Sequence, residues 1–458
     1  MEKEYKLLFP SNNPSDATYS NATGQVEIVF PISAQDVFLK GGSLRFCGGL
    51  ELEIYGAAGA VTDIDPATQA KRVYLDWRTG LYSCIQQLSI RSLVTRQSLE
   101  VINNYDQLMS SLIPVFHSEA DYSSTQSNTH LAGNDVNKSL KMMTGTARRQ
   151  TFASRLYSGL LFNDEPIPLS RTFGTGGLEI TIRLQVPQQV LSDLGGGGAT
   201  NGSGATFRVI NPSLQYEVLK PSPEQLGSLQ QQSESVFRYN SLSSLVSVIN
   251  SGDHNAVFNV ASVSGLISAF VKMVPTNWLN SYSNWSQSTG ELRNSTTATP
   301  NYVNKATLRR VSFYKGGVKY PLDFSIIRNQ LNTNEILLSQ FMRYGVDSIR
   351  NFDDINHILP DGRIKADDNN AYQVIAAGPK VAADIINGKD TYKGSEYFIL
   401  GTNFDPLGES GAPFDNETFG FEVQSDLTNT NDSPNTAFIF LMSKNTLRTN
   451  QGVAQVTM

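Results

Sequence analysis

The chain has 458 residues, of which 17% are charged and 40% hydrophobic, and its formal net charge is −6. This hydrophobic content is enough for sizeable cores and excludes a chain that is disordered throughout. No cluster of basic residues is present at either end, which argues against a protein that coats nucleic acid by neutralising its phosphates. No apolar run approaches the length of a membrane span, and the first residues lack a signal-peptide core.

The composition predicts a mostly β protein of two domains. The charged fraction lies well below the average of about 25%. Ser, Thr, Asn and Gln make up the difference, and 36 glycines and 19 prolines supply turns between strands. A chain of this length exceeds one hydrophobic core, so we expect two units of somewhat over 200 residues each.

Alternation of apolar and polar residues predicts strands along the first half. These strands fall at 25–30, 50–54, 73–75, 152–162, 178–186 and 207–218. The alternation is clearest in 178–186, where Leu178, Ile180 and Ile182 are separated by polar residues. Two polar or glycine-rich stretches, 118–141 and 195–204, are predicted to be long surface loops.

A strand followed by a helix forms the centre of the first half. The strand is predicted over Tyr82–Ile90, and a polar reversal follows at 95–97. Apolar residues then recur at helical spacing, at Val101, Ile102, Tyr105, Leu108, Met109 and Leu112. This spacing predicts an amphipathic helix over 101–112 with a buried apolar face, and Pro114 is expected to end it.

The same order of strand, reversal and helix returns in the second half. Phe313 lies in an alternating stretch, a turn at 315–317 follows, and a helical pattern occupies 336–344. The interval from Ile90 to Phe313 is close to half the chain length, which indicates a duplication.

The composition changes at 220–223, where Lys-Pro-Ser-Pro begins a Gln- and Ser-rich stretch. We therefore expect an N-terminal domain of residues 1–222 and a C-terminal domain of residues 223–458. The second half restarts with strands at 235–249, 257–263, 266–274, 397–400, 419–423 and 437–442. Short strands without a βαβ rhythm are typical of sandwiches and barrels.

The chain has two cysteines, Cys47 and Cys84, so a disulfide framework does not hold it together. They could pair if the fold brings them close. We favour two buried free thiols in a reducing compartment.

Motifs that carry chemistry are missing from the sequence. The histidines have no companion at metal-ligand spacing and are interpreted as surface or loop residues: His117, His130, His254 and His357. The glycines at 174–177 precede a strand instead of following one, so they do not form a dinucleotide-binding loop. Adjacent acids at 353–354 and 367–368 are interpreted as solvated, and the acidic stretch 405–417 lacks the ligand spacing of an EF-hand. We therefore expect no catalytic, cofactor-binding or metal site.

The order of elements resembles that of double-jelly-roll major capsid proteins, especially those of polinton-like viruses and virophages. In the first half it is carried by Tyr82–Ile90, Asn103-Asn104-Tyr105, Phe152–Tyr157, Pro166–Leu169 and Leu178–Val186. In the second half it is carried by Arg310–Tyr314, the helix near Phe341, Phe419–Val423 and Phe438–Phe440. The resemblance lies in order and pattern and covers nearly the whole chain.

This resemblance implies an all-β fold of two tandem eight-stranded jelly-roll barrels, each with a short helix in a strand connection. It implies a structural protein, not an enzyme, that forms homotrimeric pseudo-hexagonal capsomers of an icosahedral DNA virus shell. The implied partners are the chain itself, neighbouring capsomers, penton and minor capsid proteins, and in some relatives an internal membrane. The implied location is the virion capsid, assembled inside the host cell, without direct contact with nucleic acid.

Two other classes of function remain open at this point. A β-rich viral spike or fibre protein would have a similar polar composition, but it would show fibrous repeats or an aromatic glycan-binding cluster. A two-domain β-sandwich carbohydrate-active protein would need a cleft with paired carboxylates.

Overall fold

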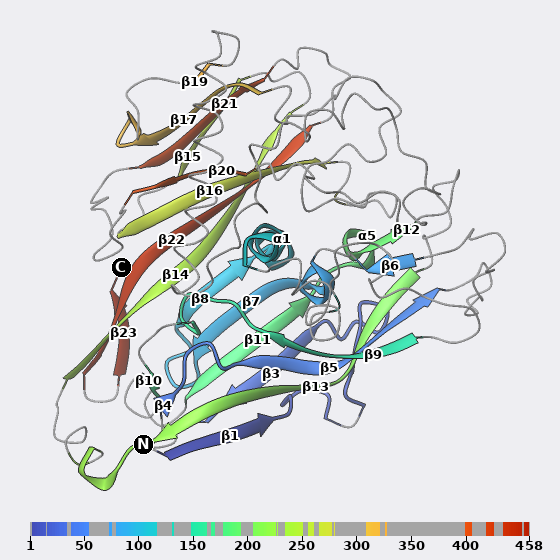
Figure 1. Ribbon diagram of the computed structural model, residues 1–458, viewed down its shortest axis with the longest axis vertical. Coiled ribbons are helices and arrows are strands. Elements are labelled where there is room, and N and C mark those ends of the chain that lie inside the picture. Colours follow the sequence, from blue (N-terminus) through green and yellow to red (C-terminus); the bar gives the residue numbers. More distant parts are fainter. Residues whose placement is uncertain are drawn as a thin grey trace.

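The computed structural model of the chain is drawn in Figure 1. The residues that the structure describes are 2–14, 16–33, 38–54, 73–75, 79–116, 131, 148–162, 166–169, 177–193, 205–225, 227, 234–250, 255–260, 265–276, 279, 308–320, 326–327, 399–404, 418–425, 434–450 and 453–457.

The first set of strands forms two facing sheets. One sheet has the order β1 (Glu2–Leu8), β13 (Ala205–Lys220), β5 (Arg45–Ile54) and β9 (Arg148–Arg155). The short strands β2 (Thr18–Tyr19), β4 (Phe38–Leu39) and β10 (Ile167–Pro168) extend it. The facing sheet has the order β3 (Glu27–Ile32), β11 (Leu178–Leu184), β7 (Ile85–Ser92) and β8 (Ser98–Asn103).

The second set of strands also forms two sheets. One has the order β14 (Glu234–Ile249), β22 (Asn435–Asn450), β16 (Leu266–Pro275) and β20 (Ile399–Asn403), with β23 (Val453–Thr457) added to β22. The other has the order β15 (Asn255–Val260), β21 (Phe419–Ser425), β17 (Leu308–Lys315) and β18 (Val318–Tyr320), with β19 (Ile326–Ile327) added to β17.

The two sets have the same topology. The eight principal strands, in chain order, are β1, β3, β5, β7, β8, β9, β11 and β13 in the first set and β14, β15, β16, β17, β18, β20, β21 and β22 in the second. In each set one sheet has the first, eighth, third and sixth of these strands side by side. The other sheet pairs the second, seventh, fourth and fifth. This is the order of a jelly roll, in which two Greek keys wrap into facing sheets. Ile90 and Phe313 both lie on the fourth strand of their set. The predicted all-β double jelly roll is therefore confirmed.

Aromatic side chains hold the facing sheets together in both sets. In the first set the rings of Phe30 on β3 and Phe46 on β5 meet edge to face, with centroids 6.2 Å apart. In the second set Phe404, which follows β20, meets Phe419 of β21 edge to face at 5.8 Å. Phe313 of β17 is fully buried and lies 5.2 Å from the ring of Phe421. Edge-to-face packing is favourable for such rings beyond the area that they bury.

The central helix begins later than its sequence pattern predicts. Val101 and Ile102 belong to β8, where they pair with Ser89 and Leu88 of β7. The helix, α1, spans Tyr105–Phe116. Asn104 separates the two elements with a φ of 52°, a left-handed conformation that asparagine tolerates. Ile102 is buried and Val101 is half-buried in β8, so these two strand residues extend the helical spacing by coincidence.

Three other boundaries differ from the predictions. Pro114 does not stop α1, which ends two residues later, so that the proline lies in the last turn. The predicted strand Tyr82–Ile90 begins as the short 3-10 helix η1 (Gly80–Cys84) before β7. The strand predicted over 152–162 ends at Arg155, with the end of β9.

Several predicted segments lie outside the described residues. These are the helix at 336–344, the loop at 195–204 and, apart from Leu131, the loop at 118–141.

Two short elements complete the first set near α1: the helix α5 (Pro187–Val190), and a small sheet of β6 (Val73–Leu75) and β12 (Leu191–Asp193).

Candidate functional site

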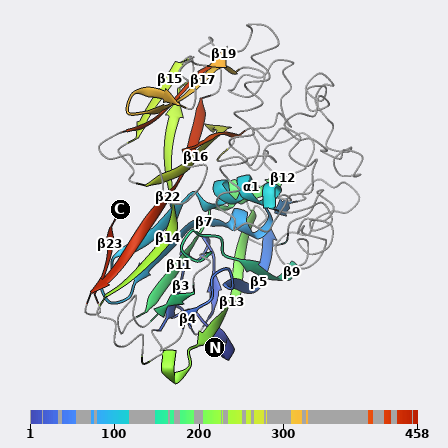
Figure 2. The same ribbon diagram turned by 60° about the vertical axis from the view of Figure 1, so that its left-hand side comes forward.

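The two sets of strands meet along one continuous sheet. Ser243 of β14 pairs with Val101 of β8 in a single parallel bridge, which joins the sheets into nine strands. Figures 1 and 2 show α1 beside this line, between the first set and the strands β14, β22 and β16. We call the contacts along this line the junction, and they form the most elaborate polar site among the described residues.

Glu100 is the central acceptor of the junction. Its side chain, at 3% exposure, projects from β8 toward the turn after β9 and toward β14. Its carboxylate accepts backbone N–H bonds from Gly159 at 3.0 Å, Leu160 at 3.1 Å and Leu242 at 2.8 Å. Burial raises the pKa of Glu100, and the backbone donors partly oppose that rise. One side chain thus bonds to backbone of both strand sets.

The backbone of the turn at Gly159 and the backbone of β14 come close together beside this carboxylate. A Cβ atom at Gly159 would overlap the carbonyl oxygen of Asn240, so only glycine fits beside β14. The hydroxyl of Tyr239 donates to the carbonyl of Leu99 at 3.1 Å, and Ser244 Oγ donates to the carbonyl of Asn103 at 2.6 Å. These bonds set the position of β14 along β8.

The helix α1 is buried on its polar side as well as on its apolar side. Leu108, Met109 and Leu112 are fully buried, as the helical spacing predicts. Gln107 and Ser110 on the other side are also buried, at 3% exposure each. An amphipathic helix usually turns its polar face to water, so this face must be covered by another part of the fold.

Lys272 of β16 covers that polar face. The side chain is 1% exposed, and its Nζ donates to Gln107 Oε1 at 2.9 Å and to Ser110 Oγ. Asp106 lies next to these residues, and its Oδ2 accepts bonds from Gln107 Nε2 and Gln185 Nε2. Burial raises the pKa of Asp106 to about 6, opposed by these bonds and by Lys272. The junction therefore includes a buried cation, two buried carboxylates and amide side chains.

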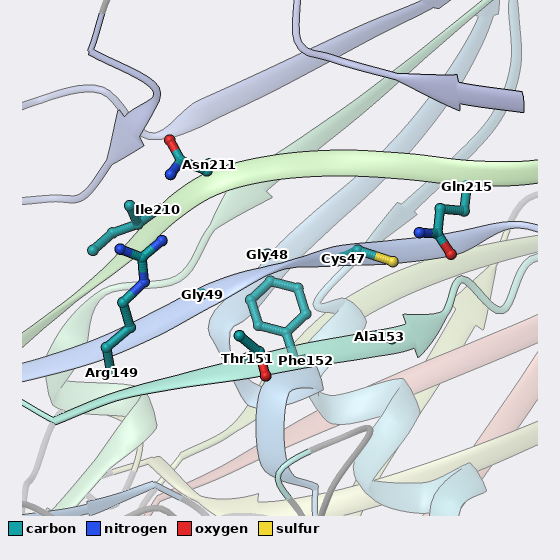
Figure 3. A pocket seen from close by; sticks show the side chains of 10 residues that line it. All are labelled: Cys47, Gly48, Gly49, Arg149, Thr151, Phe152, Ala153, Ile210, Asn211 and Gln215. Carbon is teal, nitrogen blue, oxygen red and sulfur yellow. The ribbon is translucent and has the colours of Figure 1, made fainter.

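The outer side of the β1–β13–β5–β9 sheet is hollowed. The hollow has a volume of about 410 Å³ and is lined from β5, β9 and β13. Figure 3 shows Arg149 running from β9 across β5 toward Ile210, with Cys47 and Gln215 at the other end. Gly48 has no side chain to separate β5 from the carbonyl of Ile210, where the pairing of β13 is irregular.

The remaining sequence predictions about sites have these outcomes. Cys47 and Cys84 do not form a disulfide, and Cys84 is buried whereas Cys47 is half-buried. The four histidines and the acidic stretches at 353–354, 367–368 and 405–417 lie outside the described residues. Within the described residues no group of His, Cys, Asp and Glu is arranged to hold a metal ion. No helix among them combines the length and apolar character needed to cross a bilayer.

The junction residues could not be identified from the sequence. Glu100 is separated by 59 and 142 positions from Gly159 and Leu242, and Lys272 lies 165 positions from Gln107. Local periodicity carries no information about partners at such separations. The one available signal was Lys272 itself, a charged residue inside an otherwise apolar strand.

Comparison with known proteins shows the fold. The sequence matches no protein-family model and no curated protein. A chain of the Sputnik virophage structure superposes with a TM-score of 0.58 at 11% identity, covering 100% of this chain and 88% of that one. A chain of the PBCV-1 virus capsid gives 0.57 at 11% identity, covering 100% and 97%. The Faustovirus major capsid protein gives 0.53 at 11% identity, covering 98% and 90%. The chain therefore has the double-jelly-roll fold of viral major capsid proteins.

Proposed function

We propose that the protein is a major capsid protein, a structural component of a virion shell. The observation that carries this proposal is the extent of the fold likeness. The PBCV-1 capsid chain is matched over almost its full length and over all of this chain, so neither barrel is left without a counterpart. A shared fold alone leaves function open, and here the shared feature is a tandem arrangement of two barrels.

The junction supports a role in which the two barrels act as one rigid tile. Buried hydrogen bonds cross between the strand sets: Glu100 accepts one, and Tyr239 and Lys272 each donate one. Buried polar groups must be satisfied, so such a network favours one relative position of the barrels. A shell needs subunits of constant shape, because the same contacts repeat around each symmetry axis.

The assembled unit that we propose is a homotrimer. Residues 1–222 and 223–458 supply one barrel each, so three chains place six similar barrels around a threefold axis. This outline tiles as a pseudo-hexagon in an icosahedral shell of a DNA virus. Neighbouring capsomers, penton proteins and minor capsid proteins are the proposed partners, with a membrane beneath the shell as a further one. Assembly takes place inside the host cell, without direct binding of nucleic acid.

Native mass spectrometry and light scattering of the recombinant full chain test the proposal. We expect a trimer of three 50.2 kDa chains that resists dilution into the nanomolar range, because obligate interfaces bury roughly 2,000 Å² or more. Negative-stain images should show pseudo-hexagonal particles of that mass. A monodisperse monomer at micromolar concentration would overturn the proposal and favour a carbohydrate-active protein, whereas elongated particles would favour a fibre.

A further inference from the structure

A row of side chains crosses the outer side of the β1–β13–β5–β9 sheet. Leu7 on β1 lies opposite Gln215 on β13. Gln215 also lies opposite Arg45 on β5, and Arg45 lies opposite Arg155 on β9. Residues directly opposite in an antiparallel sheet share one face. Phe46, the neighbour of Arg45, is fully buried in the core, so this row points outward. We call this side the outer face.

Large apolar side chains are exposed at the β1 edge of the outer face. Tyr5 is 70% exposed and Leu7 is 54% exposed, and they alternate along β1 so that both point outward. Phe9, two residues further on, is 62% exposed. Single exposed apolar residues are common on monomers, but three at neighbouring positions make a patch of the kind that marks interaction sites.

Three arginines that form no ion pair with any described carboxylate lie at the β9 edge of the outer face. Arg45 and Arg155 are directly opposite each other, and like charges in that position destabilise a sheet. Arg149 is exposed on the same strand as Arg155. Among the described residues no carboxylate forms an ion pair with any of these three arginines, whereas Arg208 on the same sheet is paired with Glu51.

The hollow lies between these two edges. Cys47 and Gly49 face outward in its floor, and Arg149 reaches over Gly49 (Figure 3). Because Gly49 has no side chain, the side chain of Arg149 can lie directly over β5 at this position. The outer face thus combines an apolar strip, a hollow lined by both apolar and polar residues, and arginines that form no ion pair with any described carboxylate.

We propose that a second copy of the chain docks on the outer face, with carboxylates of that copy pairing with Arg45, Arg149 and Arg155. This inference rests on the proposed self-assembly and adds to it the surface that is used. Charge complementarity selects the partner, because the chain carries a net charge of −6 and a second copy brings an excess of carboxylates.

The composition and position of the outer face agree with this partner. Tyr, Phe and Arg are the residues that protein interfaces concentrate. Figures 1 and 2 both place β1 and β13 at the end of the molecule away from β15, β17 and β21, so these three strands of the second set do not cover the outer face.

Alkylation of Cys47 measures whether the outer face is covered. Cys84 is fully buried, so Cys47 is the thiol that iodoacetamide reaches in the native chain. The reaction is followed by peptide mass spectrometry in the wild-type oligomer and in the Arg155→Glu variant. We expect Cys47 to react roughly tenfold or more slowly in the wild-type oligomer than in the variant. Denatured samples, in which both thiols react, calibrate the measurement.

Arg155→Glu separates association from folding. The new carboxylate lies opposite Arg45, where opposite charges stabilise a sheet, so the single chain should still fold and its far-UV circular dichroism spectrum should match that of the wild type. Association should nevertheless weaken by roughly tenfold or more, because the carboxylates of the partner copy are repelled. Arg448→Glu is the matched control: Arg448 is exposed on β22, away from the outer face, and the same charge change there should leave the oligomer intact.

The possible contrary results distinguish failure of the proposed function from failure of the proposed docking surface. A wild-type monomer overturns the proposed function together with this inference. A wild-type oligomer in which Cys47 reacts as fast as in Arg155→Glu overturns this inference alone, as does equal weakening by Arg155→Glu and Arg448→Glu. Binding of fluorescent duplex DNA at about 0.15 M salt, lost in Arg155→Glu, would reassign the outer face to nucleic acid and would also overturn it.

Discussion

The carboxylate of Glu100 accepts the backbone N–H of Leu242 at 2.8 Å, and this bond joins β8 of the first barrel to β14 of the second. The same carboxylate accepts two more N–H bonds from the turn that contains Gly159. A shell subunit of two barrels needs a fixed angle between them, and a buried acceptor shared by both barrels supplies part of that constraint.

We expect Glu100→Gln to lower the free energy of unfolding by about 1–3 kcal/mol. The amide has nearly the same shape, but its NH2 group cannot accept an N–H bond, so one buried backbone donor loses its acceptor. Guanidinium denaturation at a fixed chain concentration measures the loss. Glu217→Gln is the control, because Glu217 forms ion pairs with the partly exposed Lys3 and Lys40, and its replacement should cost at most about 1 kcal/mol. Equal losses in the two variants would contradict the role given to Glu100.

Gly159→Ala should also weaken the junction, by about 1–3 kcal/mol, because its Cβ would force the turn away from the carbonyl of Asn240. Thermal denaturation with limited proteolysis between residues 220 and 234 reports both stability and loosening of the junction. Gly227→Ala is the matched control, since a Cβ there meets nothing within 4 Å. A Gly159→Ala variant as stable and as resistant to protease as Gly227→Ala would show that the approach of β14 is not tight.

The order of the strands could be predicted from the sequence because one face of most strands is buried. Leu178, Ile180 and Ile182 alternate with more exposed or polar residues, and that periodicity is local. The beginning of α1 could not be placed in the same way, because both strand β8 and the helix bury apolar residues and the change of period depends on Asn104.

The junction could not be predicted from local sequence patterns, for a different physical reason. Its groups are polar residues whose burial depends on contacts between barrels. Gln107 and Ser110 have the spacing of a solvated helix face, and they are buried because the side chain of Lys272 reaches them from β16.

The outer face could be predicted in part. The alternation of Tyr5, Leu7 and Phe9 is visible in the sequence, but the exposure of these side chains depends on β1 being at a sheet edge.

The apolar side of α1 gives a direct test of the helical spacing. Leu108 is fully buried, so Leu108→Ala should cost about 2–5 kcal/mol of unfolding free energy through lost burial and a residual cavity. Chemical denaturation measures it. The same substitution at Leu245, which is 39% exposed on β14, removes far less buried surface and should cost less than about 1 kcal/mol. Similar costs at both positions would mean that the site around Leu108 collapses when the side chain is shortened.

The stability of the junction should depend on pH through Asp106. Its pKa is about 6 in the folded chain, above the ordinary value of 3.8, because burial disfavours the charged form. Between these two values the folded state binds more protons than the unfolded state, so the free energy of unfolding falls as pH rises through this window. The difference between these two pKa values corresponds to about 3 kcal/mol of unfolding free energy, which is present near pH 4 and lost near pH 7.

Asp106→Asn removes this titration, so its stability relative to the wild type should rise by about 3 kcal/mol between pH 4 and pH 7. Denaturation curves of both proteins across that range, at one chain concentration and ionic strength, measure the difference. Glu100 is present in both proteins, so its own titration cancels in the comparison. Asp16→Asn is the matched control, because Asp16 is exposed and lies outside the junction, and its curve should run parallel to that of the wild type. A difference between Asp106→Asn and wild type that does not change with pH would mean that the Asp106 carboxyl keeps its charge in the folded junction, stabilised there by Lys272.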